Sequence, residues 1–400
     1  MKKLAIISEY NPFHNGHNYI QKKAKKISNA DIIISIMSGD FVQRGEPSLI
    51  DKYKRANSAL ISADLIIEMP SFVTLQSANL FARKNIEILN KLEVDYLAFG
   101  IENISKNDFL NSANNILNND KLINEKIKKL LNKGMSYSKA SYEASKSYAI
   151  NDNFFSANNI LALEYIRAMK NINSNIKVIP IKRIKSLNRD ISLNNNTYAS
   201  STAIRNNISK TNLRSYLPPC SYENIMKFQN EYKSFPTMEK IYELFRYKIL
   251  IDNKDLNKIL CYEEGLENYL KKLAINNSTY NNFIKNASSY RFTKSRIKRL
   301  IINYLLENTI DLNDVDINFI KVLAFNEKST KLLKNTKLSV IIQKKDKDKI
   351  KNDEKIIYDQ MIRASNLYSL LINRNLNSDF TQKIVLKKSS NFELTPKSCT

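Results

Sequence analysis

The only two histidines of the chain, His14 and His17, lie three residues apart in the segment Asn11 to His17. Imidazole N–H groups donate hydrogen bonds to anionic oxygens, and Gly16 between them lets a backbone approach a ligand closely. A helix that begins at this point adds free N–H groups and a positive dipole end. The segment therefore predicts a phosphate seat, where displacement at an α-phosphorus is catalysed by positioning and electrostatics and needs no protein nucleophile.

A second interpretation of these histidines stays open, namely two surface residues that cap a helix. Their small number still excludes a His-rich metal site and a Ser-His-Asp triad elsewhere in the chain. The three cysteines lie far apart without CxxC spacing, so no thiolate zinc site is expected. Asp40, next to Gly39, is a candidate for binding Mg²⁺ through water.

The elements that must position the histidines alternate between short apolar runs and segments of helical period, which favours a parallel sheet covered by helices. Such a sheet binds ligands beyond the carboxyl ends of its strands. The histidines, Gly39 and Gly100 each follow an expected strand, so they converge on one edge. The expected strands are residues 4–8, 31–37, 64–68, 95–99 and 177–181, and the expected helices between them are 17–27, 52–62 and 76–92.

The charge of the whole chain indicates a polyanionic partner. Lys and Arg number 63 against 39 Asp and Glu, which leaves a net charge of +24. Self-repulsion makes that charge costly without a polyanion, and nucleic acid is the first expectation. The alternative is a general over-use of Lys and Asn. No apolar run is long enough for a membrane span and no signal peptide is evident, so we expect a cytoplasmic protein without a membrane partner.

A length of 400 residues predicts two domains, with a boundary near Pro218-Pro219, at residues 1–217 and 218–400. Beyond it no strand alternation is evident, and the chain to about residue 375 has helical period. In residues 290–305 an apolar stripe occupies one helix face, which leaves the cations pointing outward to meet RNA phosphates or simply solvent. These candidate tRNA-binding residues are Arg291, Lys294, Arg296, Lys298 and Arg299.

Two motifs in order, HNGH at residues 14–17 and SSTAIR at residues 200–205, resemble the nucleotidyltransferase superfamily with a HUP-type Rossmann-like fold. Within this superfamily, six further segments resemble the tRNA(Met) cytidine acetate ligase family. They are EYNPFHNGH (9–17), MSGDFVQRGEP (37–47), FGIEN (99–103), NNIL (158–161), YEEGLE (262–267) and YRFTKSRIKRL (290–300). Where the family commonly has Pro before the NN pair and Gly after NNIL, this chain has Ala157 and Ala162.

The resemblance implies an α/β fold, with a Rossmann-like parallel sheet in the N-terminal catalytic domain and an α-helical, tRNA-binding C-terminal domain. It implies ATP-dependent activation of acetate to acetyl-adenylate, then acetyl transfer to the wobble cytidine of elongator tRNA(Met), which gives N4-acetylcytidine. A single-stranded anticodon loop exposes that base at little cost. Mg²⁺ is a possible companion of ATP, and no protein partner is inferred.

The resemblance also implies an ATP site, in which His14 and His17 are catalytic. The implied ATP-binding residues are Ile7, Ser8, Glu9, Tyr10, Asn11, Pro12, Phe13, His14, Asn15, Gly16, His17, Asn18, Tyr19, Ile20, Gly100, Asn158, Arg183 and Ile184. Further candidates for phosphate contacts are Ser201, Thr202 and Arg205, whose motif is also an ordinary helix start. Lys52 and Arg55 are candidates for the triphosphate, with surface solvation as the alternative.

Two other functions stay open on the sequence alone. A nucleotidyltransferase of the same fold would make a small cofactor or activated alcohol and would turn over without RNA. An RNA-binding protein without activity would keep the HNGH loop as a remnant. The charge of +24 favours an RNA substrate over a small metabolite.

Overall fold

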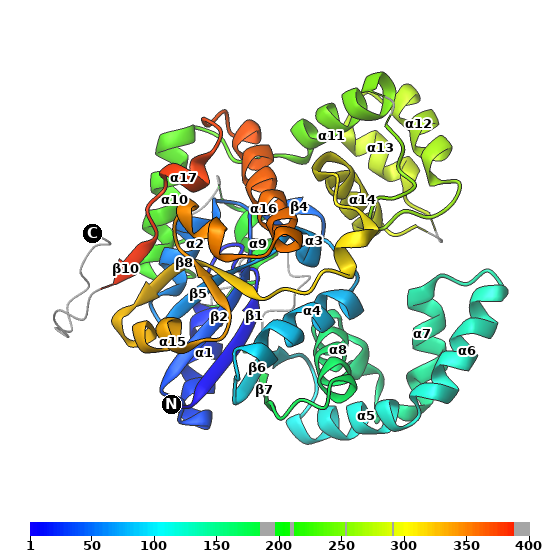
Figure 1. Cartoon of the computed structure of the whole chain (residues 1–400). Coiled ribbons are helices and arrows are strands. Elements are labelled where there is room, and N and C mark those ends of the chain that lie inside the picture. Colours follow the sequence, from blue (N-terminus) through cyan, green and yellow to red (C-terminus); the bar gives the residue numbers. More distant parts are fainter. Residues whose placement is uncertain (185–196, 209–211, 253, 290–291, 388–400) are drawn as a thin grey trace.

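The computed structural model describes residues 1–184, 197–208, 212–252, 254–289 and 292–387. Within them an eight-stranded sheet has the order β10-β8-β5-β2-β1-β6-β7, with β9 paired to β8 (Figure 1). All five expected strands are present and mutually parallel, which confirms the α/β fold class. They are β1 (Lys3–Ser8), β2 (Ile32–Ser38), β5 (Leu65–Met69), β6 (Tyr96–Ile101) and β7 (Lys177–Lys182).

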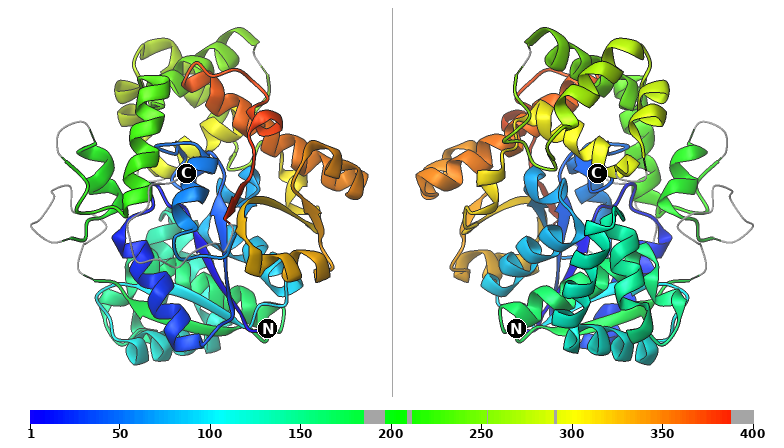
Figure 2. Two further views of the ribbon diagram at one scale, coloured as in Figure 1. Left: turned by 90° about the vertical axis from the view of Figure 1, so that its left-hand side faces the viewer. Right: turned by 90° about the vertical axis from the view of Figure 1, so that its right-hand side faces the viewer.

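The central strand β2 explains how the sheet is covered. Its sequence IIISIMS is buried at every position, as expected of a parallel strand with helices on both faces. Ile34 packs into a core with α4, α5 and α8, whereas Ile33 packs into a second core with α1 and α2. Alternate side chains of one strand therefore hold opposite helix layers, and Figure 2 shows these layers from both sides.

The expected helices are confirmed, with ends that differ by a few residues. The N-terminal half contains α1 (Asn15–Ser28), α2 (Lys52–Ala59), α3 (Ser71–Thr74), α4 (Ala78–Lys91), α5 (Lys106–Asn118), α6 (Asp120–Asn132), α7 (Tyr137–Ser145), α8 (Ala157–Asn171) and α9 (Ser201–Asn206). A two-stranded hairpin of β3 (Phe41–Val42) and β4 (Glu46–Pro47) follows β2. No helix in the described part of the chain is long and apolar enough to cross a membrane.

The second half begins with a helical cluster whose core also includes residues of the first half, such as Phe41 and Ile50. It comprises α10 (Pro219–Tyr232), α11 (Met238–Tyr247), α12 (Leu266–Asn276), α13 (Tyr280–Ala287) and α14 (Lys294–Leu306). In Figure 1, α11 to α14 lie together, above the sheet and its helices. The helical character expected for this region is confirmed, while the exact boundary near residue 218 stays a prediction.

The expectation that no strand follows residue 218 is wrong. β8 (Phe319–Asn326) pairs antiparallel with β5 and extends the sheet of the first half, followed by β9 (Ser339–Ile341) and β10 (Val385–Lys387). The sequence FIKVLAFN shows no alternation because six of its residues are buried, and the other two strands have only three residues each. α15 (Thr330–Asn335), α16 (Asn352–Leu371) and α17 (Ser378–Thr381) accompany them.

Candidate active site

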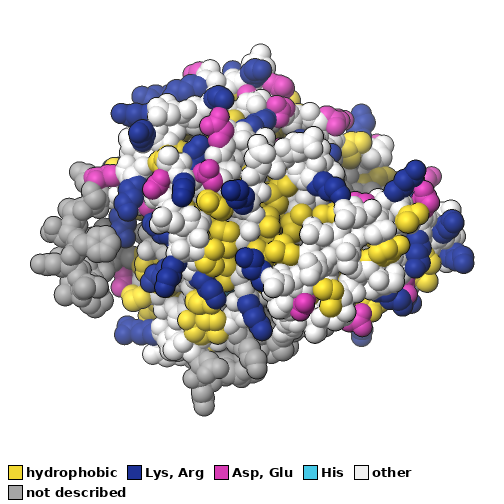
Figure 3. Space-filling model, turned by 90° about the horizontal axis from the view of Figure 1, so that it is seen from below, with side chains coloured by type: hydrophobic (Ala, Val, Ile, Leu, Met, Phe, Trp, Pro, Cys, Tyr) yellow, Lys and Arg dark blue, Asp and Glu magenta, His cyan; other side chains and the backbone are white. Residues whose placement is uncertain are grey.

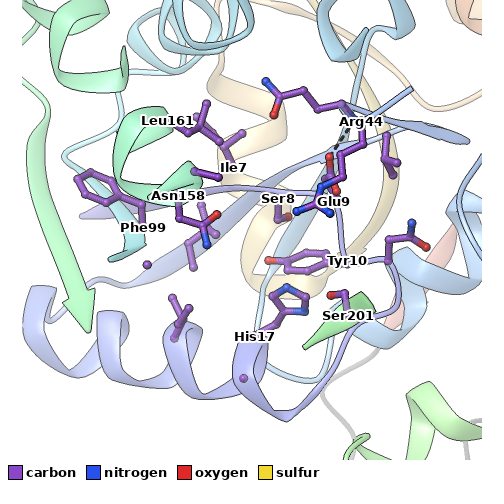
Figure 4. Close-up of a pocket in the computed structure, with 18 of the residues that line it drawn as sticks. Ile7, Ser8, Glu9, Tyr10, His17, Arg44, Phe99, Asn158, Leu161 and Ser201 are labelled. Atoms are coloured by element: carbon purple, nitrogen blue, oxygen red, sulfur yellow. Dashed lines mark hydrogen bonds between the residues drawn. The ribbon is translucent and has the colours of Figure 1, made fainter. Parts of the chain in front are cut away.

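A cavity of about 260 Å³ opens at the carboxyl end of β1 (Figure 4). It lies where β1, β6, the start of α1, the hairpin β3–β4 and the starts of α8 and α9 meet. The lining residues are Ile6, Ile7, Ser8, Glu9, Tyr10, Asn11, Gly16, His17, Ile20, Val42, Gln43, Arg44, Phe81, Phe99, Gly100, Ala157, Asn158, Leu161, Tyr165, Arg183, Ser201, Thr202 and Arg205. The edge predicted from the sequence is therefore the edge that carries the pocket.

The start of α1 fixes both imidazoles through backbone hydrogen bonds. His14 is the N-cap, and its Nδ1 accepts from the N–H of Gly16 at 3.0 Å. The Nδ1 of His17 accepts in turn from the N–H of His14 at 3.3 Å. Because each neutral ring uses Nδ1 as an acceptor, its proton is on Nε2. The two rings stack with centroids 3.7 Å apart, and the ring of His17 lines the cavity.

Burial keeps both imidazoles neutral. It lowers the pKa of His14 from 6.5 to about 3, with the charges of Arg183 and Arg205 adding to the effect. Burial likewise holds the pKa of His17 well below its ordinary value, with further contributions from His14 and Arg183. The Nε2 of His14 is buried and has no partner among the described residues. At neutral pH the pair therefore offers directed hydrogen-bond donors and no fixed charge.

Fixed positive charge comes from three arginines that line the same cavity. Arg205 donates to the backbone oxygen of Asn11 at 2.8 Å, and Arg183 lies 3.5 Å from the carboxylate of Glu102. Arg44 has no hydrogen bond or ion pair to any residue in the described ranges and is exposed. In Figure 4, Arg44 and His17 lie on opposite sides of Tyr10. The cavity can thus hold an anion between a guanidinium and an imidazole.

The first turn of α9 adds backbone donors at this end. The side chain of Ser200 is the N-cap and accepts from the N–H of Ala203 at 3.0 Å. Ser201 and Thr202 follow it and line the cavity. A helix start with free N–H groups is a favourable seat for phosphate oxygens.

The opposite end of the cavity includes the apolar side chains of Phe99 and Leu161 on its wall. A Cβ on Gly100 would lie 2.9 Å from the Cγ of Arg183 and 3.3 Å from the Cδ1 of Ile20, so only glycine fits there. The side-chain amide of Asn158 donates to Glu102 at 2.5 Å. One carboxylate therefore positions both Asn158 and Arg183, and this end offers amide and guanidinium groups that can hydrogen-bond a base.

The structure brings most of the expected ATP-site residues to the cavity and leaves some outside it. Ile7 to Asn11, Gly16, His17, Ile20, Gly100, Asn158, Arg183, Ser201, Thr202 and Arg205 line it. Pro12, Phe13 and His14 lie behind it, where the ring of Phe13 stacks on His17. Asn15, Asn18 and Tyr19 line a second hollow, and Ile184 is 38% exposed beyond β7 and lines neither.

Lys52 and Arg55 do not reach the cavity, so the prediction of triphosphate contacts is wrong for both. The ammonium of Lys52 is buried between Glu68 and Asp379, each 2.8 Å away. Arg55 is fully buried and donates to backbone oxygens, including that of Glu9 at 2.6 Å. The sequence did not reveal the burial of Lys52, because the compensating carboxylate of Asp379 lies more than 300 residues away along the chain.

Asp40 is also buried in that cluster and is not a candidate for a metal at the cavity. Its carboxylate accepts from the backbone N–H of Lys52 at 2.9 Å and from the hydroxyl of Ser365 at 3.0 Å. Among the described residues, no group of three or more His, Cys, Asp or Glu is placed to hold a metal ion.

Sequence reasoning missed several residues of the cavity, above all those of the hairpin after β2. The backbone N–H of Gln43 donates to the carboxylate of Glu9 at 2.8 Å and so joins the hairpin to the end of β1 (Figure 4). Val42 and Arg44 line the cavity beside it. A signal was present, because polar residues that directly follow a buried strand fall at the ligand-binding edge. No pattern in the sequence indicated Phe81 and Tyr165, since these residues lie inside helices and do not follow a strand.

The cations expected on the outside of α14 have mixed positions. Lys294 is exposed, and Arg296 forms an ion pair with Glu263 at 2.7 Å. Lys298 forms an ion pair with Glu46, and Arg299 donates to the backbone oxygen of Gln43 at 3.3 Å. The expected outward position is therefore wrong for Lys298 and Arg299, which face the hairpin. Arg291 lies outside the described residues.

Comparisons with known proteins agree with this geometry. The family model described as HIGH Nucleotidyl Transferase matches residues 1–383. The chain belongs to this family. A tRNA(Met) cytidine acetate ligase of Caldicellulosiruptor bescii is 34% identical, with 92% of this chain and 94% of the relative covered. One of Lysinibacillus sphaericus is 33% identical, with 96% and 98% covered, so this member of the HIGH nucleotidyl transferase family groups with ligases.

Solved structures show the same fold. The chain of Thermotoga maritima TmcAL bound with alpha-thio ATP has a TM-score of 0.85 and 28% identity, and the match covers 97% of this chain and all of that one. The apo form of the same Thermotoga protein has a TM-score of 0.87 at 29% identity, with equal coverage. The similarity thus extends over both the sheet and the helical second half of this HIGH nucleotidyl transferase.

Proposed function

We propose that this enzyme uses ATP to activate acetate as acetyl-adenylate and transfers the acetyl group to the wobble cytidine of elongator tRNA(Met), forming N4-acetylcytidine. The observation that carries the proposal is the neutral imidazole of His17, with the ring of His14 stacked behind it, at a helix N-terminus that shares one cavity with three arginines. The names of the relatives and the ATP analogue held by the Thermotoga protein support it.

In the first step the adenine occupies the end near Gly100 and Asn158, and the phosphates lie against the starts of α1 and α9. An oxygen of acetate bonds to the α-phosphorus while the bond from that phosphorus to the bridging oxygen breaks. Pyrophosphate leaves with the electron pair. The Nε2–H of His17 and the guanidinium of Arg205, which both line the cavity, stabilise the charge that develops on the phosphate oxygens. Mg²⁺, where present, is carried by the phosphates, since Asp40 does not face the cavity.

In the second step the exocyclic N4 of cytidine attacks the acetyl carbonyl of acetyl-adenylate. The bond from that carbonyl carbon to the phosphate oxygen breaks, AMP leaves, and N4 loses a proton. Because acetyl-adenylate is a mixed anhydride from which AMP departs readily, orientation of the two reactants supplies most of the catalysis. The positive charge of the chain, +24, brings the polyanionic tRNA to the enzyme.

The test is a reaction with ATP and labelled acetate, with and without tRNA(Met), in which pyrophosphate and labelled cytidine are measured. We expect pyrophosphate formation to depend on acetate, and the label to appear on tRNA only when ATP is present. His17→Ala is expected to slow pyrophosphate formation by at least about a hundredfold, the usual effect of a lost transition-state donor. The exposed substitution Arg83→Gln serves as the control.

Two results would refute the proposal. One is pyrophosphate formation that needs a small phosphorylated metabolite in place of acetate, which would instead support the alternative of a nucleotidyltransferase for a cofactor or activated alcohol. The other is tRNA binding without any ATP turnover in the wild-type enzyme, which would leave only an RNA-binding protein.

A further inference from the structure

A second hollow, of about 590 Å³, lies on the outer face of α1. It is lined by Asn15, Asn18, Tyr19, Lys22, Lys23, Lys26 and Tyr198. Hydrogen bonds fix one wall of the hollow. The side-chain amide of Asn15 donates to the backbone oxygens of Thr197 at 3.0 Å and of Ser215 at 2.9 Å. The segment that carries Tyr198 is thereby held against the first turn of α1.

The hollow is cationic and contains no acidic side chain among its lining residues. Lys22, Lys23 and Lys26 are all exposed, and α1 itself includes no Asp or Glu. Lys22 and Lys26 form no ion pair with any described residue. Seen from below, the molecule shows many Lys and Arg side chains and fewer acidic ones (Figure 3). The chemistry of the hollow thus fits a ligand that carries several negative charges.

Two aromatic rings stand among these cations. The rings of Tyr19 and Tyr198 meet edge to face with centroids 6.4 Å apart, and both residues are half-buried. The ammonium of Lys23 lies 5.2 Å from the centre of the Tyr19 ring and donates to its hydroxyl at 2.7 Å. Aromatic rings on which bases stack, placed beside cations that contact the backbone, are how proteins hold single-stranded nucleic acid.

We propose that this hollow binds an unpaired stretch of the RNA substrate, with one base stacked on Tyr19 or Tyr198 and the adjoining phosphates on the three lysines. This inference rests on the proposed function. Gly16 and His17 line the catalytic cavity while Asn15 and Asn18 line the hollow, so the two sites share the first turn of α1. The separation across that turn is about one helix diameter, roughly 10 Å. RNA held in the hollow therefore has its neighbouring unpaired nucleotides close to the acetyl-adenylate.

Charge on α14 is a weaker candidate for the same role. Two of its cations already bind groups of the hairpin, since Lys298 forms an ion pair with Glu46 and Arg299 donates to the backbone oxygen of Gln43. Arg296 is occupied by Glu263. Lys294 is the exposed cation that the described part of this helix leaves without an ion pair. The hollow on α1 offers more uncompensated charge and lies beside the catalytic histidines.

The test compares two triple variants of equal charge change. Lys22→Gln/Lys23→Gln/Lys26→Gln removes the cations of the hollow, and Lys128→Gln/Lys129→Gln/Lys133→Gln removes three exposed lysines of α6 and the residue that follows it. We expect the first triple to raise the Kd for tRNA(Met) at least tenfold relative to the second. We also expect it to lower the slope of log K against log salt by about two, because each single-strand phosphate contact contributes about 0.7.

Two further variants test the rings. Tyr19→Ala and Tyr198→Ala are each expected to weaken tRNA binding, at least fivefold for whichever ring stacks on the base, whereas Phe at the same position keeps the affinity close to wild type. Acetate-dependent pyrophosphate formation without tRNA is expected to stay unchanged in the triple-lysine variant. This second readout separates a lost RNA contact from misfolding.

The outcomes separate this inference from the proposed function. If wild-type enzyme neither binds nor acetylates tRNA, the proposed function fails. If wild-type enzyme acetylates tRNA and the two triple variants bind it equally well, the hollow is not the RNA site and the inference is overturned. Loss of RNA-independent pyrophosphate formation in the α1 triple would overturn it as well, because the lysines would then serve the ATP reaction.

Discussion

At the scale of single residues, the site depends on groups whose protonation and direction are set by their neighbours. The backbone N–H donors that bind the Nδ1 atoms of His14 and His17 leave the Nε2–H groups free for a ligand. Ser8 adds a buried hydroxyl with no partner among the described residues. Unpaired buried polar groups are costly, and a bound phosphate would satisfy them. The arrangement therefore gives up some stability for binding.

Burial of a neutral His14 makes stability depend on pH. In the unfolded chain this imidazole takes up a proton near pH 6.5, whereas in the folded chain it stays neutral down to about pH 3. The unfolded state binds more protons between these values, so the free energy of unfolding falls as the pH falls. At pH 5 the contribution of one such group is about 2 kcal/mol. We expect His14→Asn, which keeps a capping side chain, to lose less stability than wild type between pH 7 and pH 5.

Urea denaturation at the two pH values measures this difference. Asp and Glu residues titrate in both proteins alike, so the comparison isolates the imidazole. An equal loss of stability in wild type and variant would show that His14 is already protonated in the folded enzyme at pH 5.

Glu102 is expected to act through the residues it positions. Its carboxylate accepts from Asn158 and pairs with Arg183 at the base-binding end of the cavity. Glu102→Ala frees both side chains and is expected to raise the KM for ATP about tenfold, which corresponds to a loss of about 1.4 kcal/mol. Glu102→Gln keeps an acceptor oxygen and is expected to retain most of the affinity. Steady-state kinetics at saturating acetate measure both, and equal KM values in the two variants would contradict the positioning role.

At the scale of elements, the hairpin β3–β4 joins the helical half to the catalytic cavity. Arg44 faces the cavity, while the next residue, Gly45, packs against the backbone of α14. A Cβ on Gly45 would lie 2.5 Å from the backbone nitrogen of Arg299 and 2.7 Å from the Cβ of Lys298. The hairpin therefore contacts the cavity through Arg44 and α14 through Gly45.

Gly45→Ala tests this joint. Its φ of +73° and the close contact with α14 lead us to expect a loss of about 2–4 kcal/mol in the free energy of unfolding. Gly134→Ala is the matched control, because Gly134 has a φ of +81° and nothing within 4 Å of an added Cβ, so only the backbone cost of about 1 kcal/mol remains. We also expect slower pyrophosphate formation in Gly45→Ala alone. Urea denaturation measures the stability of both variants, and kinetics measure their pyrophosphate formation. Equal losses of stability in Gly45→Ala and Gly134→Ala would refute the close contact with α14.

At the scale of the whole molecule, a buried ion cluster fastens the end of the chain to the sheet. Asp379 of α17 lies 2.8 Å from the ammonium of Lys52 and also pairs with Lys321 of β8. Glu68 of β5 completes the cluster at 2.9 Å from Lys321. With Asp40 beside Lys52, its members come from residues 40 to 379, so the cluster joins residues from both halves of the described chain.

Removal of Asp379 would leave the buried ammonium groups of Lys52 and Lys321 to share Glu68, with Asp40 3.9 Å from Lys52. Asp379→Ala is expected to cost about 3–5 kcal/mol of unfolding free energy, as for other broken buried pairs. Lys337→Ala is the control, because its ion pair with Glu93 is exposed and its loss is expected to change little. Urea denaturation measures both variants, and similar midpoints would show that the cluster is not closely coupled to folding.

The sequence by itself determined the parallel sheet, its carboxyl edge and the HNGH site, because apolar period and helix-start chemistry are local and leave a pattern in consecutive residues. Only the tertiary structure decided that Lys52 and Arg55 are buried, that Lys298 and Arg299 face the hairpin, and that β8 extends the sheet. Arg55 is held by backbone oxygens closer in the chain, such as that of Ile50, whereas the other outcomes depend on partners hundreds of residues away, such as Asp379 for Lys52. A charged side chain has the same local pattern whether water or a distant carboxylate compensates it, so long-range contacts decide which of the two occurs.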